Sequence, residues 1–121
     1  MATNYFGVRK VKQIIKEIFL PDVVFFDRSY KRYSGYERIR GCNSYCMFSV
    51  AFHRYINDNF WLSFNFYDDD CEFLCYSIVF EFTSDLTVIY PDNGNHLIDL
   101  MHSEAGFNEL VALYKPKDKQ S

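Results

Sequence analysis

The segments CMFSVAFH at residues 46–53 and FWLSFNFY at residues 60–67 carry the clearest structural pattern in this chain. Apolar residues alternate with smaller or polar ones in both, and side chains of a β-strand point alternately to opposite faces. The residues expected to face inward are Cys46, Phe48, Val50 and Phe52 in the first strand and Phe60, Leu62, Phe64 and Phe66 in the second. Residues 56–59 (INDN) suit a tight turn, because Asn and Asp tolerate a left-handed backbone. We therefore expect a hairpin.

Further strands are predicted downstream of this hairpin. Residues 68–70 (DDD) form the next predicted turn. Residues 71–82 predict a third strand, with Leu74, Tyr76, Ile78, Phe80 and Phe82 inward and Cys71, Phe73, Cys75, Ser77, Val79 and Glu81 outward. Residues 86–90 predict a fourth. Short connections favour antiparallel pairing of neighbouring strands, so the pattern indicates a meander.

Helices are predicted on both sides of this meander. Apolar residues recur at helical spacing over residues 8–19, and Pro21 ends that helix. A short buried strand is expected at residues 22–27. After the sheet, Asn95 is the predicted N-cap of a short helix, and a second helix follows Ser103 and Gly106 and ends before Pro116. The expected fold is α+β: a four- to five-stranded antiparallel meander with an N-terminal helix and C-terminal helices packed on one face.

Composition bounds the class of protein. The chain has 121 residues, of which 49% are hydrophobic and 20% aromatic, so we expect residues 1–121 to form a single domain with a frayed tail at residues 115–121. No apolar run is long enough for a membrane span, and the N-terminus lacks the pattern of a signal peptide. We expect a cytoplasmic protein without membrane contact.

The four cysteines, Cys42, Cys46, Cys71 and Cys75, are interpreted as reduced thiols. Two pairs with three intervening residues suggest a zinc site, but residues four apart in a strand lie roughly 13 Å from each other. No metal site is therefore predicted.

The charge distribution is the strongest functional signal. Residues 55–114 contain eleven Asp and Glu but no Lys or Arg, although the whole chain carries a net charge of only −3. A fixed negative field raises the encounter rate with a basic partner. Outward aromatic residues near the acids would supply anchors for such a partner. The residues predicted to bind it are Asp58, Trp61, Tyr67, Asp68, Asp69, Asp70, Glu72 and Asp85.

Motifs of catalysis and cofactor binding are missing from the sequence. The five glycines form no phosphate-binding loop, and no Ser or Cys lies in a nucleophile elbow. We therefore expect no enzyme activity and no cofactor. The favoured hypothesis is a small acidic inhibitor that binds and occludes a basic partner. This would be an immunity protein that neutralises a nuclease-type toxin, or a phage-type inhibitor of a defence nuclease. An exposed aromatic face would also allow a homodimer.

A first alternative is a nucleic-acid-binding module. Residues 28–41 are interpreted as a long loop in which basic residues and tyrosines are interleaved, which suits phosphate contact and base stacking. Its candidate residues are Arg28, Tyr30, Lys31, Arg32, Tyr33, Tyr36, Arg38 and Arg40. A second alternative is a metal-dependent hydrolase that uses the carboxylates of residues 68–72, since clustered carboxylates bind hard cations.

Overall fold

The computed structural model describes residues 7–26, 31–33, 36–54 and 57–116, and its fold is α+β. Within these residues, seven strands form one antiparallel sheet in the order β1-β3-β4-β5-β6-β7, with β2 paired to β3 beside β1. The elements, in chain order, are α1 (Val8–Ile14), the π-helical segment η1 (Ile15–Phe19), β1 (Val24–Phe25), β2 (Lys31–Tyr33), β3 (Tyr36–Cys42), β4 (Met47–Arg54), β5 (Phe60–Tyr67), β6 (Ile78–Phe82), β7 (Val88–Tyr90), α2 (Gly94–Leu100) and α3 (Glu104–Leu113).

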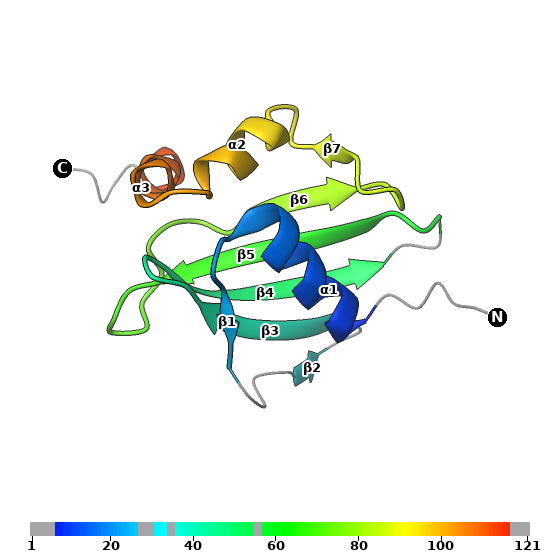
Figure 1. Cartoon of the computed structure of the whole chain (residues 1–121), viewed down its shortest axis with the longest axis horizontal. Coiled ribbons are helices and arrows are strands. Elements are labelled where there is room, and N and C mark those ends of the chain that lie inside the picture. The colour runs from blue at the N-terminus through cyan, green and yellow to red at the C-terminus, as the bar shows by residue number, and fades with distance from the viewer. Residues whose placement is uncertain (1–6, 27–30, 34–35, 55–56, 117–121) are drawn as a thin grey trace.

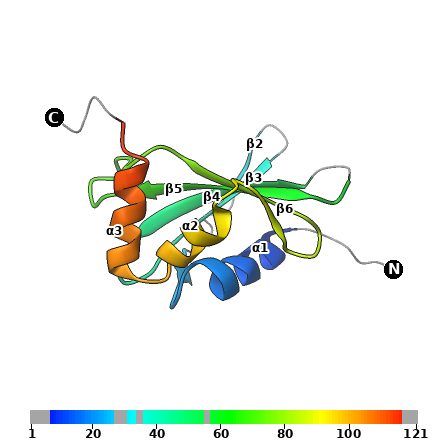
Figure 2. The same ribbon diagram turned by 90° about the horizontal axis from the view of Figure 1, so that it is seen from above.

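Helices α1 and α2 lie on one face of the sheet, as the sequence predicted, whereas α3 does not (Figure 1 and Figure 2). Figure 1 shows α1 crossing the central strands, and Figure 2 shows α1 and α2 on the same side of them. The ring of Phe19, at the end of η1, contacts Phe64 of β5 and Phe80 of β6, with centroid distances of 4.8 and 5.1 Å. The inward residues predicted for β4 and β5 are all buried. Alternation therefore identified the core of the sheet.

Helix α3 has a different position. It stands across one end of the sheet, and its C-terminal end reaches the side opposite α1 (Figure 2). There the backbone N–H of Tyr76 donates to the carbonyl of Tyr114 at 3.0 Å. At the other end of α3, the Ser103 hydroxyl accepts from the Gly106 N–H at 3.1 Å, as an N-cap does. Helix α3 thus brings Lys115 to the uncovered side of the sheet.

The prediction of a loop at residues 28–41 was wrong for most of its length. Lys31–Tyr33 and Tyr36–Cys42 are strands, which also raises the strand count above the expected four to five. Ile39 is fully buried, and a Cβ on Gly41 would lie 2.7 Å from the Val24 carbonyl oxygen. The two glycines and many charges indicated a loop, but this glycine permits close strand packing instead.

The third predicted strand is interrupted. Phe73 bridges to Tyr67, whereas the regular strand β6 begins only at Ile78, opposite Phe64. The chain takes five steps from Phe73 to Ile78, while β5 takes three between their partners. The Leu74 N–H still donates to the Phe66 carbonyl at 2.9 Å, and the two extra residues displace residues 75–77 from the ladder. Cys75 is therefore buried and Tyr76 is 60% exposed, the reverse of the predicted orientations.

Smaller differences concern the ends of elements. The predicted strand at residues 22–27 is only Val24–Phe25 within the described residues, and β7 begins at Val88. Helix α2 begins earlier than predicted, with Asn93 rather than Asn95 at its N-cap, because the Leu97 N–H donates to the Asn93 carbonyl at 3.1 Å. Of the predicted tail, Lys115 and Pro116 are described.

Candidate outer-face binding site

The face of the sheet opposite α1, called here the outer face, is the candidate site. The register of β3, β4, β5 and β6 aligns its side chains in four rows across the strands. These are His53–Trp61–Glu81, Arg38–Ala51–Ser63–Val79, Arg40–Ser49–Asn65 and Cys42–Met47–Tyr67–Phe73. Trp61, Tyr67 and Phe73 therefore occupy the outward positions that the sequence predicted. The N-terminal helix covers the opposite face.

The two middle rows form a low strip, which we call the trough. Its floor consists of Ala51, Ser63, Asn65 and Ser77, which are small or polar, and Ser49 lies buried beside them at 1% exposure. Two side-chain hydrogen bonds order this floor: Ser77 donates to the Asn65 amide oxygen, and the hydroxyls of Ser49 and Tyr67 lie 3.0 Å apart. Small side chains on neighbouring strands leave room above the sheet for a ligand.

Aromatic rings border the trough on both sides. On one side the His53 and Trp61 rings lie 6.1 Å apart and tilted by 36°; on the other the Tyr67 and Phe73 rings stack at 5.1 Å and 30°. We call these the tryptophan row and the tyrosine row. Trp61 and Tyr67 are six residues apart on β5, so the rows are separated by about 20 Å.

Two neighbouring depressions occupy this face. One, of about 440 Å³, lies over the trough and is lined by Arg38, Ala51, Trp61, Ser63, Asn65, Ser77 and Val79. The other, of about 550 Å³, is lined by Asn65, Phe73, Leu74, Cys75, Tyr76, Ser77, Lys115 and Pro116. They share Asn65 and Ser77. The second depression exists where residues 75–77 leave the ladder, so the interruption of the predicted strand creates it.

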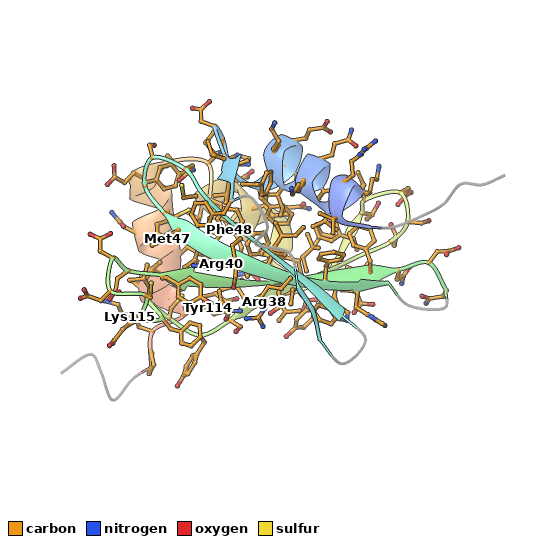
Figure 3. All side chains as sticks on the ribbon, turned by 90° about the horizontal axis from the view of Figure 1, so that it is seen from below. Arg38, Arg40, Met47, Phe48, Tyr114 and Lys115 are labelled. Atoms are coloured by element: carbon orange, nitrogen blue, oxygen red, sulfur yellow. The ribbon has the colours of Figure 1, made fainter. Side chains whose placement is uncertain are left out.

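Cationic side chains flank the depressions. Arg38 and Arg40 are outward residues of β3, and Arg38 lines the smaller depression. Arg40 lies over the Phe26 ring at 5.6 Å. Lys115 lines the larger depression, beyond β6. Figure 3 shows Arg38 and Lys115 on the side of the sheet opposite α1, whereas Phe48 lies on the α1 side.

The acidic turn, residues 68–72, adjoins the tyrosine row. The Asp68 carboxylate accepts from the backbone N–H groups of Asp70 and Glu72 at 2.9 and 3.0 Å, so it holds the turn together. Asp69, Asp70 and Glu72 are exposed. The positive φ of Cys71, 64°, lets the chain reverse direction here. Three carboxylates are thus presented beside Phe73 in a hydrogen-bonded turn.

The predicted partner-binding residues do not form one patch. Trp61 and Tyr67 share the outer face, and Asp68, Asp69, Asp70 and Glu72 adjoin Tyr67. Asp58 lies at the opposite end of β5, about 33 Å from Asp68 at the usual strand rise. Asp85 lies in the β6–β7 turn at that same far end (Figure 1).

Asp85 contributes to its own turn. Its carboxylate accepts from the hydroxyl of Thr83 and, at 3.0 Å, from that of Thr87. These hydrogen bonds, the Thr83 bond first, lower the pKa of Asp85. The Asp85 carboxylate therefore stabilises the β6–β7 turn.

The candidate nucleic-acid residues are placed only in part. Arg28 and Tyr30 lie outside the described residues. Lys31, Arg32, Tyr33 and Tyr36 are placed by their backbone in β2 and β3. Arg38 and Arg40 are on the outer face with the trough.

The described residues do not form the metal site that the hydrolase alternative requires. Among the described residues, no three His, Cys, Asp or Glu side chains are grouped to hold a metal ion. All four cysteines are free thiols. Burial raises the pKa of Cys46 to about 12 and that of Cys75 to about 11. These two buried thiols remain protonated at neutral pH.

Sequence reasoning missed Tyr76, Lys115 and the floor of the trough. The floor had a signal, since Ser49 and Ala51 on one strand face Asn65 and Ser63 on the next. No sequence pattern indicated Tyr76 and Lys115. They line one depression because of where α3 ends and because of the two extra residues before β6.

The chain was compared with known proteins in three ways. A scan of protein-family models, a search of curated proteins and a search of solved structures each found no match. Separately, none of the helices in the described ranges has the length and apolar character needed to cross a membrane.

Proposed function

We propose that the protein is a small inhibitor that binds and occludes a basic partner protein. The partner would be a nucleic-acid-processing enzyme, either a nuclease-type toxin, for which this chain is the immunity protein, or a defence nuclease blocked by a phage-type inhibitor. Such enzymes need a positive cleft to hold phosphates. An inhibitor with fixed negative charge matches that cleft.

One observation carries this proposal: an aromatic pair with one exposed ring, that of Phe73, lies beside an exposed acidic turn. Phe73 is 64% exposed, stacks on Tyr67, and directly follows Asp69, Asp70 and Glu72 along the chain. Binding energy in protein interfaces concentrates in a few aromatic or Arg anchors, and charges around them set specificity and association rate. The outer face combines an aromatic anchor and fixed charges where the tyrosine row adjoins the acidic turn.

Order in the acidic turn adds further support. Besides the two bonds to the Asp68 carboxylate, the Asp68 N–H donates to the Glu72 carbonyl at 2.9 Å and the Cys71 N–H donates to the Asp68 carbonyl at 3.0 Å. A surface that is already ordered loses less conformational entropy on binding. The acids can therefore be presented without a refolding step.

The test combines charge reversal with capture of the partner. Immobilised protein is incubated with lysate from its native host, and the captured protein is assayed for nucleic-acid cleavage. We expect a basic nuclease that the wild-type chain inhibits. Reversal of Asp69, Asp70 and Glu72 to Lys should slow association about tenfold or more at low salt and much less at 1 M salt, where screening acts within about 3 Å.

A charge-matched control separates the turn from net charge. Reversal of Glu17, Asp92 and Asp99 to Lys changes the charge equally at exposed positions outside the acidic turn. This variant should retain inhibition. If both variants behave alike, or if neither salt nor reversal affects binding, the acidic turn does not form the interface.

A further inference from the structure

We propose that the trough and its two aromatic rows bind single-stranded nucleic acid. This inference does not rest on the proposed inhibitor function, because it uses the cationic part of the outer face rather than the acidic turn. It shares Arg38 and Arg40 with the loop hypothesis, but it places them on a strand and adds residues of β4, β5, the segment before β6 and the end of α3.

The first argument is the alternation of rings and charge. Trp61 and Phe73 border the trough, and Arg38 and Arg40 line it on the β3 side. A single strand offers an unpaired planar ring and a negative phosphate at every unit. Aromatic platforms beside a positive groove are the usual means of binding it. An anionic ligand with a single ring would leave one of the two aromatic rows without a partner.

The second argument is the size and chemistry of the floor. The two aromatic rows are separated by about 20 Å, a span of a few nucleotides. Between them lie hydroxyl and amide groups of Ser63, Asn65 and Ser77, which can donate to and accept from base edges. Bases in a duplex are paired and stacked on each other, so they cannot use this floor.

The third argument concerns the ends of the site. Lys115 lies by the larger depression, across the sheet from Arg38 and Arg40. Beyond the tyrosine row, the acidic turn repels phosphates and so limits the site at that end. Phosphates are thereby favoured between the cations, over the small floor.

The chain supplies its own reporter for this site. Trp61 is the only tryptophan in the sequence and belongs to the tryptophan row. A base that stacks on its indole should change its fluorescence. We expect a short oligo(dT) and an RNA of equal length to quench Trp61 and to raise the anisotropy of a labelled oligonucleotide, near 50 mM salt.

Variants should separate stacking from charge. Phe73→Ala should weaken oligonucleotide binding about 5- to 150-fold, the range for loss of one stacked base. Arg38→Ala with Arg40→Ala should lower the salt slope by about 1.4, because each phosphate contact of a single strand contributes about 0.7. The control, Arg9→Ala with Lys16→Ala, removes the same charge from exposed positions of the N-terminal helix and should leave the slope unchanged.

Several results would overturn this inference. Neither quenching nor anisotropy change near 50 mM salt would exclude nucleic-acid binding at this face. If the protein bound duplex as tightly as the single strand, its binding would be due to charge attraction alone. The same would hold if heparin bound as tightly as the oligonucleotide and the Trp61 fluorescence were not quenched. If Phe73→Ala abolished capture of a basic protein while no oligonucleotide bound, the face would serve the inhibitor function alone. Far-UV circular dichroism of each variant verifies that it folds.

Discussion

The rings of Tyr67 and Phe73 stack across the break between β5 and β6, with centroids 5.1 Å apart. This pair closes the acidic turn and also forms one border of the trough. The two proposed surfaces therefore meet at one aromatic contact. A basic protein seated on the acidic turn and an oligonucleotide seated in the trough would both need Phe73, so we expect them to compete.

Phe73 should matter for binding and little for stability. Phe73→Ala removes an exposed ring but also its stack on Tyr67, and should lower the free energy of unfolding by about 0.5–1.5 kcal/mol. Phe19→Ala removes a fully buried ring in contact with Phe64 and Phe80 and should cost about 3–5 kcal/mol. Urea denaturation followed by Trp61 fluorescence measures both. A large loss of stability in Phe73→Ala would show that the ring is structural.

The carboxylates of the acidic turn should divide into structural and binding groups. Asp68→Ala removes the acceptor of two backbone N–H groups and should cost about 1 kcal/mol, as loss of a helix cap does. Asp69→Ala removes an exposed side chain from the same turn and should change stability by less than about 0.5 kcal/mol. Thermal unfolding of the two variants compares them directly. Equal values would mean that the Asp68 hydrogen bonds do not hold the turn.

The cysteines should differ in reactivity. Cys71 is exposed, whereas Cys46 and Cys75 are buried and burial raises their pKa values to about 12 and 11. Because the thiolate is the nucleophile, iodoacetamide near pH 8 should modify Cys71 well before these two. Mass spectrometry of timed samples gives the order. Fast labelling of Cys75 in the folded chain would show that residues 74–77 open readily.

The same thiols predict an alkaline loss of stability. In the unfolded chain a cysteine ionises near pH 9, so between pH 9 and about 11–12 the unfolded state has released protons that the folded state keeps. Stability from Cys46 and Cys75 is therefore complete below pH 9 and falls as the pH rises through that window. Unfolding midpoints measured across it should fall less steeply in Cys46→Ala than in the wild type. Other ionising groups act equally in both proteins.

Gly106 should not tolerate a side chain. A Cβ at this position would lie 2.3 Å from the Leu100 carbonyl oxygen, which belongs to the last residue of α2. Gly106→Ala should force α2 and α3 apart and cost about 1–3 kcal/mol, despite the better helix propensity of alanine. Glu104→Ala, an exposed change in the same turn, is the control. A stabilised Gly106→Ala protein would show that the two helices can separate freely.

The sequence predicted the centre of the fold well and its margins poorly. In β4 and β5 each inward residue could be read from alternation, because large apolar side chains point toward the helices and smaller or polar ones point to the outer face. Strand β3 was not predicted, because its outward residues Arg38 and Arg40 are charged and only Ile39 marks the face that is buried.

The candidate site was predictable only for residues in regular strands. The outward positions of Trp61 and Tyr67 followed from alternation. The larger depression could not be predicted, because the sequence of residues 75–77 continues the alternating pattern although these residues do not continue the strand. The mismatch appears only when Phe73 and Ile78 are aligned with their partners on β5. The same limit separated Asp58 and Asp85 from the acidic turn, since charge counts along a chain contain no distances.

The two extra residues before β6 have a consequence for engineering this protein. The larger depression arises from chain length, not from the identity of the side chains that line it. Replacing Tyr76 or Cys75 should alter what the depression accepts but should preserve its existence. Deleting both Cys75 and Tyr76 should let the chain pair continuously with β5 from Phe73 to Phe82. The interruption would then become a regular ladder, and the depression that Lys115 lines should disappear.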